Sequence, residues 1–217
     1  MDRRPERVRA VYDRIAAHFA KTRAHPWPDV AEFVARAPAA STALDLGCGN
    51  GRHAELLADR ADRVLGVDLS RGALGTARDR AAERDFDLAL VQGDAAALPL
   101  RDGRVDLAVY VAALHHLPDR ETRVASLDEL ARVLALGGRG LVSVWSTAHD
   151  RFDADPGAAS GFDTTVDWTL PGGETVPRFY HVYAPAEFER DLAASALAVE
   201  RTWVAAGNCY AAVAGRP

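Results

Sequence analysis

The stretch LDLGCGNGR, residues 44–52, decides the fold of this chain. It predicts a buried strand, a tight turn and the start of a helix. The residues that carry this interpretation are Asp45, Gly47, Gly49 and Gly51. Glycines at such a turn let backbone amides approach a ligand where side chains would collide. A GxGxG pattern is equally compatible with a turn that binds nothing, so the surrounding sequence has to decide.

The surrounding sequence alternates between two kinds of segment. Short apolar runs predict buried strands at 42–47, 63–69, 87–92, 105–111 and 140–145. The charged segments between them predict helices, with Ser70 and Asp119 as N-caps and Gly137 and Gly138 ending the third helix. Strand and helix in alternation indicate an α/β fold, in which helices cover both faces of a parallel sheet.

The pattern changes after Trp145. Gly, Pro, Asp and Thr dominate the next residues, which we expect to form an irregular lid or substrate loop. A helix and two strands, 197–206 and 208–215, follow and predict a hairpin at the sheet edge. We therefore expect one domain over 1–217, divided into a helical extension (1–40), a cofactor-binding core (41–145), the loop (146–183) and a terminal helix with a strand pair (184–217).

Composition limits the class of protein. The 217 residues are 48% hydrophobic and 26% charged, which is typical of a globular protein, and no apolar run has transmembrane length. A net charge of −5 argues against indiscriminate nucleic-acid coating, although residues 1–36 carry seven Arg and one Lys against five acids. The charged N-terminus lacks the apolar stretch of a signal peptide, so we expect a cytoplasmic protein. Cys48 and Cys209 predict small buried residues, and we expect no metal site.

Three acids mark three successive predicted strand ends, namely Asp45, Asp68 and Asp94. The carboxyl ends of parallel strands meet at one edge of a sheet, so these side chains predict a nucleoside site. Asp68 suits ribose hydroxyls and Asp94 suits an adenine amino group. A nicotinamide dinucleotide and S-adenosylmethionine both satisfy this pattern.

The set LDLGCGNG, VDLS and GDAAALPL, within residues 41–145, resembles the seven-stranded, Rossmann-like class I S-adenosylmethionine-dependent methyltransferases. The resemblance implies that Asp45 holds the methionine amino group, Asp68 the ribose, and Asp94 with the Ala95 amide the adenine. The remaining cofactor-binding residues that it implies are Gly47, Gly49, Gly51, Leu69 and Val111. It also implies that VYVAALHHL, residues 109–117, lines the methyl group and its acceptor.

A second resemblance comes from the stretch AKTRAHPWPDV, residues 20–30, where Pro26 and Pro28 forbid a continuous helix. With other residues it looks like the tRNA wobble-uridine methyltransferases that esterify 5-carboxymethyluridine. The residues that carry this resemblance are Tyr12, His18, Phe19, Thr22, Arg23, Pro26, Trp27, Pro28, His115, His116, Trp145, Tyr180, His181 and Tyr183. Some members of that family carry a long charged insertion before the stretch that matches RFYHVY, and this chain lacks it; members also often carry an aromatic pair in the last strand, where this chain has Cys209 and Tyr210.

A carboxylate acceptor has a pKa near ~4 and needs no general base, but a buried anion needs cationic or hydrogen-bonding partners. We therefore expect Arg23 and His116 as catalytic residues, with Arg178 and Tyr12 as further anchors. Candidates for substrate binding also include Trp27, Trp145, Tyr180, His115 and His181. Alternatively, Arg23 only pairs with an acid on the surface, Trp27 staples the N-terminal helix to the core, His115 is structural, and His181 is a satisfied core histidine.

The resemblance implies two partners, tRNA and a small zinc-binding activator subunit. The strand FDLALVQ, residues 86–92, is expected at an open sheet edge with few charges, which is where an added strand would pair. Two other functions remain open at this point. They are a methyltransferase for a quinone or a metabolite carboxylate, and a non-catalytic binding protein that retains the fold.

Overall fold

The computed structural model describes residues 4–155 and 157–215. The elements in chain order are α1 (Pro5–Thr22), α2 (Pro28–Arg36), β1 (Ala40–Leu46), α3 (Arg52–Ala58), β2 (Ala61–Asp68), α4 (Arg71–Arg84), β3 (Ala89–Gln92), β4 (Val105–Val111), the 3₁₀ helix η1 (Leu114–His116), α5 (Arg120–Val133), β5 (Leu134–Trp145), β6 (Phe162–Thr169), β7 (Thr175–Val182), α6 (Pro185–Ala194), β8 (Ala198–Ala205) and β9 (Asn208–Ala214).

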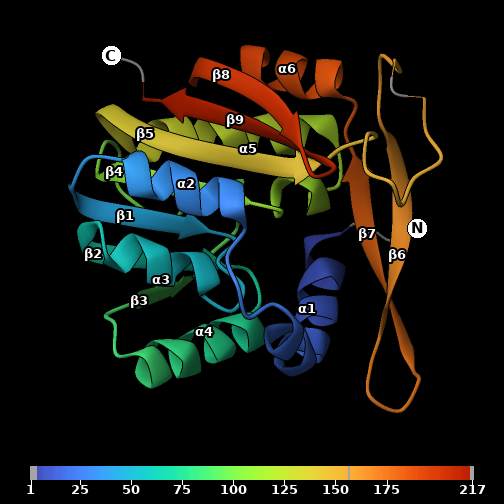
Figure 1. Cartoon of the computed structure of the whole chain (residues 1–217), viewed down its shortest axis with the longest axis horizontal. Coiled ribbons are helices and arrows are strands. Elements are labelled where there is room, and N and C mark those ends of the chain that lie inside the picture. The colour runs from blue at the N-terminus through green and yellow to red at the C-terminus, as the bar shows by residue number, and fades with distance from the viewer. Residues whose placement is uncertain (1–3, 156, 216–217) are drawn as a thin grey trace.

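Seven strands form the main sheet in the order β3-β2-β1-β4-β5-β9-β8 (Figure 1). Strands β1 to β5 run parallel, and β9 and β8 are antiparallel to their neighbours. This confirms the predicted α/β fold, the terminal hairpin, and the position of the third strand at an edge. The order reverses beside β1, so the carboxyl ends of β1, β2 and β4 open onto one crevice.

Two apolar cores hold the helices against the sheet. On one face, α2 and α3 pack against β1, β4 and β5 through residues such as Val34, Leu57 and Val109. On the other face, α5 and α6 bury Leu127 and Phe188 against the same strands. Because parallel strands are covered on both faces, they consist of nearly continuous apolar runs, which is why the sequence predicted them well.

The predicted helix signals are right at two positions and wrong at a third. Ser70 caps α4 by accepting from the Ala73 amide at 3.0 Å, and Asp119 caps α5 by accepting from the Thr122 amide at 2.8 Å. The prediction that Gly137 and Gly138 end the third helix is wrong, because α5 ends at Val133 and both glycines lie inside β5. Gly137 has φ +74°, beside an irregular register between β4 and β5.

The expected irregular segment contains a hairpin. Strands β6 and β7 pair along their whole length as a separate two-stranded sheet, which stands beside α1 and away from the main sheet (Figure 1). Burial alternates along the second half of β6, where Val166 and Trp168 are buried, and at the start of β7, whose residues 178–182 are all buried. Only part of each strand has a two-residue period, and Arg178 puts a charge at a buried position, so the prediction of irregular structure is wrong for these strands.

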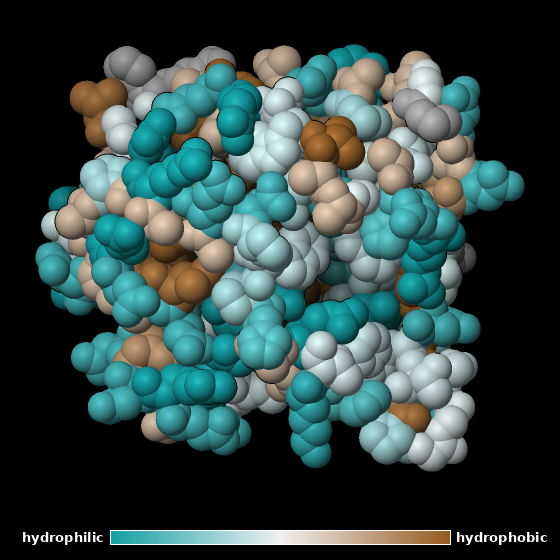
Figure 2. Space-filling model, in the orientation of Figure 1, coloured by the Kyte–Doolittle hydropathy of each residue, from teal (hydrophilic) through white to brown (hydrophobic). Residues whose placement is uncertain are grey.

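The surface is mostly polar in the face seen in Figure 2, with small separate apolar spots. Within the described ranges, no helix is long and apolar enough to cross a membrane, and no cluster of side chains has the makings of a metal site. Cys48 and Cys209 are both buried and unbridged, as expected.

Candidate active site

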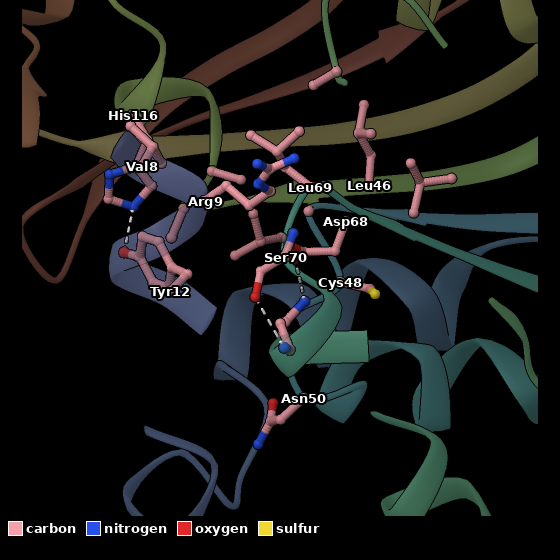
Figure 3. Close-up of a pocket in the computed structure, with 18 of the residues that line it drawn as sticks. Val8, Arg9, Tyr12, Leu46, Cys48, Asn50, Asp68, Leu69, Ser70 and His116 are labelled. Atoms are coloured by element: carbon pink, nitrogen blue, oxygen red, sulfur yellow. Dashed lines mark hydrogen bonds between the residues drawn. The ribbon is translucent and has the colours of Figure 1, made fainter. Parts of the chain in front are cut away.

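A cleft lies where β1, β2 and β4 end, and α1 forms one wall of it (Figure 3). It encloses about 1150 Å³ of empty space, part of it open to solvent. Val8, Arg9 and Tyr12 line it from α1, facing the glycine-rich turn after β1. The crevice beside the carboxyl ends of the strands, at the point where the strand order reverses, is where open α/β sheets bind their ligands.

The turn after β1 requires its glycines. Gly47 and Gly49 have φ +68° and +55°, in the left-handed region that side chains disfavour. A Cβ on Gly47 would lie 2.3 Å from the Cβ of Ala113, so the turn and the segment after β4 touch here. Gly51, at φ +74°, caps α3 and does not line the cleft. The backbone of Gly47 and Gly49 therefore forms part of the floor of the cleft.

Asp45 lies behind this turn and is 1% exposed. Its Oδ2 accepts from the Ala54 amide at 2.9 Å, which ties the end of β1 to α3. Burial raises the pKa of Asp45 to about 7, although the Ala54 amide and the charge of Arg52 oppose the rise. It is not among the residues that line the cleft, so any contact with a cofactor runs through water or a small shift.

The other two acids face the cleft. Both oxygens of Asp68 accept backbone amides, from Gly49 at 2.9 Å and Ser70 at 2.8 Å, and burial still raises its pKa. Asp94 accepts from the Ala96 amide at 2.9 Å. The predicted cofactor residues Leu69, Ala95 and Val111 line the same cleft.

Two basic residues that the sequence analysis missed also line the cleft. Arg52 is 9% exposed, its guanidinium lies 5.6 Å from the Trp27 ring centroid, and it forms no ion pair with any described residue. Burial lowers the pKa of Arg52 to about 10, so it remains charged at neutral pH. His53 is buried too, and its Nε2 has no partner in the described part of the chain. Their sequence signal was a basic pair directly after the glycine turn.

These groups fit S-adenosylmethionine. An α-carboxylate would pair with Arg52, whose guanidinium reaches only the His25 carbonyl and no described carboxylate, and would accept a hydrogen bond from His53, whose Nε2 otherwise has no partner among the described residues. An amino group would compensate the raised pKa of Asp45, and ribose hydroxyls would reach Asp68. When bound, this cofactor supplies an electrophilic methyl group.

On the α1 side of the cleft, Tyr12 and His116 form a hydrogen bond of 2.8 Å (Figure 3). His116 Nδ1 lies 2.8 Å from the Phe179 carbonyl oxygen, which only accepts, so Nδ1 carries the proton. Nε2 of the neutral ring therefore accepts from the Tyr12 hydroxyl. Burial lowers the pKa of His116 to about 3, which keeps the ring neutral at physiological pH.

Arg178 lies in a second cavity, which shares Tyr12 and His116 with the cleft. The side chain is 5% exposed and lies 5.0 Å from the Trp168 ring centroid and 5.1 Å from that of Tyr180. It donates to the Tyr180 hydroxyl, while its Nε has no hydrogen-bond partner. Among the described residues, no carboxylate forms an ion pair with it. Arg178 is therefore a buried cation without an anion from its own chain.

Some of the other predicted residues lie in the aromatic layer around Arg178, which includes Trp168, Tyr180 and Trp145. Tyr180 stacks on Trp145 at 4.4 Å and 11°, and His115 lies 4.9 Å from Tyr180. His115 Nδ1 accepts from the Trp145 amide at 3.0 Å, and its Nε2 is buried without a partner among the described atoms. Arg23 lies 5.5 Å from the ring of Trp168, so it contacts the layer from outside the cleft.

Two predicted residues lie elsewhere. Trp27 packs with the α2 core, 6.5 Å from Tyr210, and lines neither cavity. His181 is held between carboxylates, with Asp163 at 2.7 Å and Glu187 at 3.0 Å.

The corner between α1 and α2 is rigid because its carbonyls are occupied. The carbonyl of Arg23 accepts from Asn50 at 3.0 Å, and that of Ala24 accepts from Arg80 at 2.8 Å. Asn50 belongs to the glycine-rich turn, so the corner is attached directly to the cleft floor. The helix break predicted at Pro26 and Pro28 is confirmed, with Pro28 as the first residue of α2.

Comparisons with known proteins agree with this geometry. A family model described as a methyltransferase domain matches residues 43–138. The tRNA (carboxymethyluridine(34)-5-O)-methyltransferase of Schizosaccharomyces pombe is 30% identical over 172 residues, which cover 76% of this chain and 68% of that protein. The Xenopus tropicalis enzyme of the same name, alkbh8, is 39% identical over 67% of this chain. The chain spans only 22% of the frog protein's length.

Solved structures share the fold. An S-adenosylmethionine-dependent methyltransferase from Clostridium acetobutylicum superposes with a TM-score of 0.72 at 16% identity, covering 95% of this chain and 99% of that one. A putative methyltransferase solved in complex with the Haloferax volcanii Trm112 methyltransferase activator has a TM-score of 0.67 at 20% identity, covering 95% and 98%.

The match to the yeast relative extends over most of both proteins, and the cleft supplies the groups that the cofactor needs. The chain belongs to the tRNA (carboxymethyluridine(34)-5-O)-methyltransferase family, within the class I S-adenosylmethionine-dependent methyltransferases.

Proposed function

We propose that this chain transfers the methyl group of S-adenosylmethionine to the carboxylate of 5-carboxymethyluridine at position 34 of tRNA. The observation that carries the proposal is the buried, unpaired guanidinium of Arg178 beside the Tyr12–His116 pair. A buried cation without a counter-ion is costly, and an anionic acceptor removes that cost. The names of the relatives, tRNA (carboxymethyluridine(34)-5-O)-methyltransferases, support the wobble carboxylate as this anion.

The chemistry requires placement rather than proton transfer. A carboxylate is already ionised at neutral pH, so one of its oxygens attacks directly and no base is needed. His116 is neutral and accepts from Tyr12, so it orients that hydroxyl and does not remove a proton. Burial raises the pKa of Tyr12 well above its usual value, so the phenol stays a hydrogen-bond donor. Exclusion of water from this layer strengthens each of these contacts.

We assign roles to the remaining predicted residues on the same basis. Arg178 is the principal carboxylate anchor, and Arg23 supplies further positive charge from across Trp168. We assign the stacking of the splayed uracil to Trp145, which is backed by the buried ring of Tyr180. Trp27 has the stapling role, because it packs into the α2 core.

We also propose that a small zinc-binding activator pairs with β3. This strand, Ala89–Gln92, ends the sheet order, so one side of its backbone is available for an added strand. In support, a neighbour of the same fold was solved in complex with a methyltransferase activator. The variants Leu88→Asp and Leu90→Lys should abolish heterodimer formation on size exclusion, and retention of the heterodimer would contradict this interface. We place the complex in the cytoplasm, where thiols such as Cys48 and Cys209 stay reduced.

The function is tested with radiolabelled S-adenosylmethionine and bulk tRNA, with and without the activator, followed by digestion to nucleosides. Label in a uridine ester that mild base removes supports the proposal. Label in small carboxylic acids and none in RNA, with cofactor binding intact, would instead indicate a small-molecule methyltransferase.

A further inference from the structure

Helix α1 touches the cofactor site at a point that the proposed reaction does not use. Asp13 extends from α1 to the first turn of α4, where its Oδ1 accepts from the Ser70 hydroxyl at 2.7 Å and from the Gly72 amide at 2.9 Å. Both donors belong to the start of α4, so Asp13 caps this helix from outside it.

The Ser70 hydroxyl is fully engaged. It donates to Asp13 and accepts from the Ala73 amide at 3.0 Å, and the residue is 1% exposed. Its backbone amide donates to Asp68 Oδ1 at 2.8 Å, and Asp68 Oδ2 accepts from Gly49 at 2.9 Å. A continuous chain of hydrogen bonds therefore runs from α1 through the ribose-side acid to the glycine-rich turn.

Close packing keeps this chain in register. A Cβ on Gly72 would lie 2.8 Å from the Asp13 carbonyl oxygen and 3.1 Å from the Ala16 Cβ. The two helices therefore meet backbone to backbone, and a shift of α1 moves the Ser70 hydroxyl with it. Tyr12, the residue before Asp13, lies on the acceptor side and hydrogen-bonds to His116.

We propose that Asp13 is a positioning residue that fixes the carboxylate of Asp68 through Ser70 and so couples cofactor binding to the acceptor-side placement of α1. The link to the cofactor site stands on its own contacts. Its consequence for RNA rests on the proposed function.

The test compares Asp13→Ala with Asp13→Asn, whose amide oxygen still accepts from Ser70 and Gly72. The control is Arg14→Ala, which removes the neighbouring attachment of α1 to Glu174 on the hairpin and leaves the cofactor site untouched. Calorimetric titration with S-adenosylhomocysteine and with adenosine should show affinity about tenfold weaker for Asp13→Ala, and within about threefold of the parent chain for the other two.

An Asp13→Ala affinity equal to that of the parent chain, or an equal loss in Arg14→Ala, would overturn the proposal. Thermal unfolding without ligand checks that each variant is folded, and Asp13→Ser, too short to reach Ser70, replaces the alanine if needed.

A second experiment measures binding of a wobble-modified anticodon stem-loop with and without S-adenosylhomocysteine. In the parent chain the nucleoside should tighten RNA binding, and in Asp13→Ala it should not. RNA that binds neither protein contradicts the proposed function, whereas the nucleoside arm still decides the role of Asp13.

Discussion

Two buried arginines show how differently one side chain is used in this molecule. Arg123 on α5 is 4% exposed and Arg178 on β7 is 5% exposed, and the Nε of neither has a hydrogen-bond partner. Each also lies against a tyrosine ring. The difference is in the acids, because Arg123 has Glu187 at 3.8 Å and Asp191 at 4.0 Å, whereas Arg178 has none among the described residues.

Burying a charge is expensive unless an opposite charge accompanies it. Arg123 has its counter-charge from its own chain, so it joins α5 to α6 and serves the fold. Arg178 lacks one and lies beside the cleft, so its missing anion is expected to come with the substrate. Charge balance within the chain thus separates structural arginines from functional ones better than burial does.

Arg178→Ala should have the largest effect on activity, and it tests whether Arg178 serves the substrate rather than the fold. We expect kcat/KM for tRNA methylation to fall about a thousandfold, because the acceptor carboxylate loses its buried cation. Arg178→Lys should recover part of this loss, since lysine keeps the charge but not the two-pronged geometry. Single-turnover methylation at saturating cofactor measures the effect.

Urea unfolding supplies the control for that variant. Removing an uncompensated charge should leave the free energy of unfolding unchanged or higher. A large loss of stability would mean that Arg178 serves the fold after all.

Arg123→Met should show the opposite behaviour. The variant leaves Asp191, which is 0% exposed, and Glu187 with less positive charge, so we expect the free energy of unfolding to fall by about 3 kcal/mol. Methylation per folded molecule should stay close to that of the parent chain. Urea unfolding together with an activity assay below the transition tests both statements, and a selective loss of activity would contradict the assignment.

Arg52 extends the comparison to the cofactor, because it too is buried without an ion pair from the described chain. Arg52→Ala should weaken S-adenosylhomocysteine binding about thirtyfold, since the α-carboxylate loses a charged partner. Binding of 5′-methylthioadenosine, which has no carboxylate, should not change. Arg80→Ala is the matched control, because Arg80 is already paired with Glu55 at 2.6 Å. Equal losses for both ligands would assign Arg52 to a structural role, in which it packs against Trp27 and donates to the His25 carbonyl.

The cofactor half of the molecule could be predicted from sequence because its information is local. The glycine turn, the acids at the carboxyl ends of β1 and β2, and the Ser70 cap each lie within short segments. Each has a direct physical reason, such as a backbone angle that only glycine tolerates well or an orphan amide that needs an acceptor.

The residues of the acceptor side could be predicted from the family resemblance, but their arrangement in space could not. Arg178 is a buried charge between Pro177 and Phe179 in β7, a strand without sustained alternation, so the sequence pattern did not reveal it as an inward residue. Its lack of an acid partner depends on residues distant in sequence, and no local pattern encodes it. The same holds for the contact of Asp13 with Ser70, which joins segments 57 residues apart.

Asp45 is a buried acid that forms no ion pair with a described residue, as Arg52 and Arg178 are buried bases without one. Its titration gives the smallest expected effect, which is on cofactor affinity. Burial raises its pKa to about 7, so near pH 6 the ligand-free protein holds most of this group in its neutral form. A bound cationic amino group favours the carboxylate, so binding releases a proton below that pH. Affinity for S-adenosylhomocysteine should therefore rise about tenfold between pH 6 and pH 8 and level off above the pKa.

Asp45→Asn keeps an acceptor for the Ala54 amide and cannot titrate, so its affinity should be weaker and nearly flat over this range. Calorimetry at several pH values, in two buffers of different ionisation enthalpy, measures the affinity and the released proton together. A parent chain whose affinity does not change with pH would mean that Asp45 is ionised before the cofactor arrives, and its charge would then be balanced from within the chain, as that of Arg123 is.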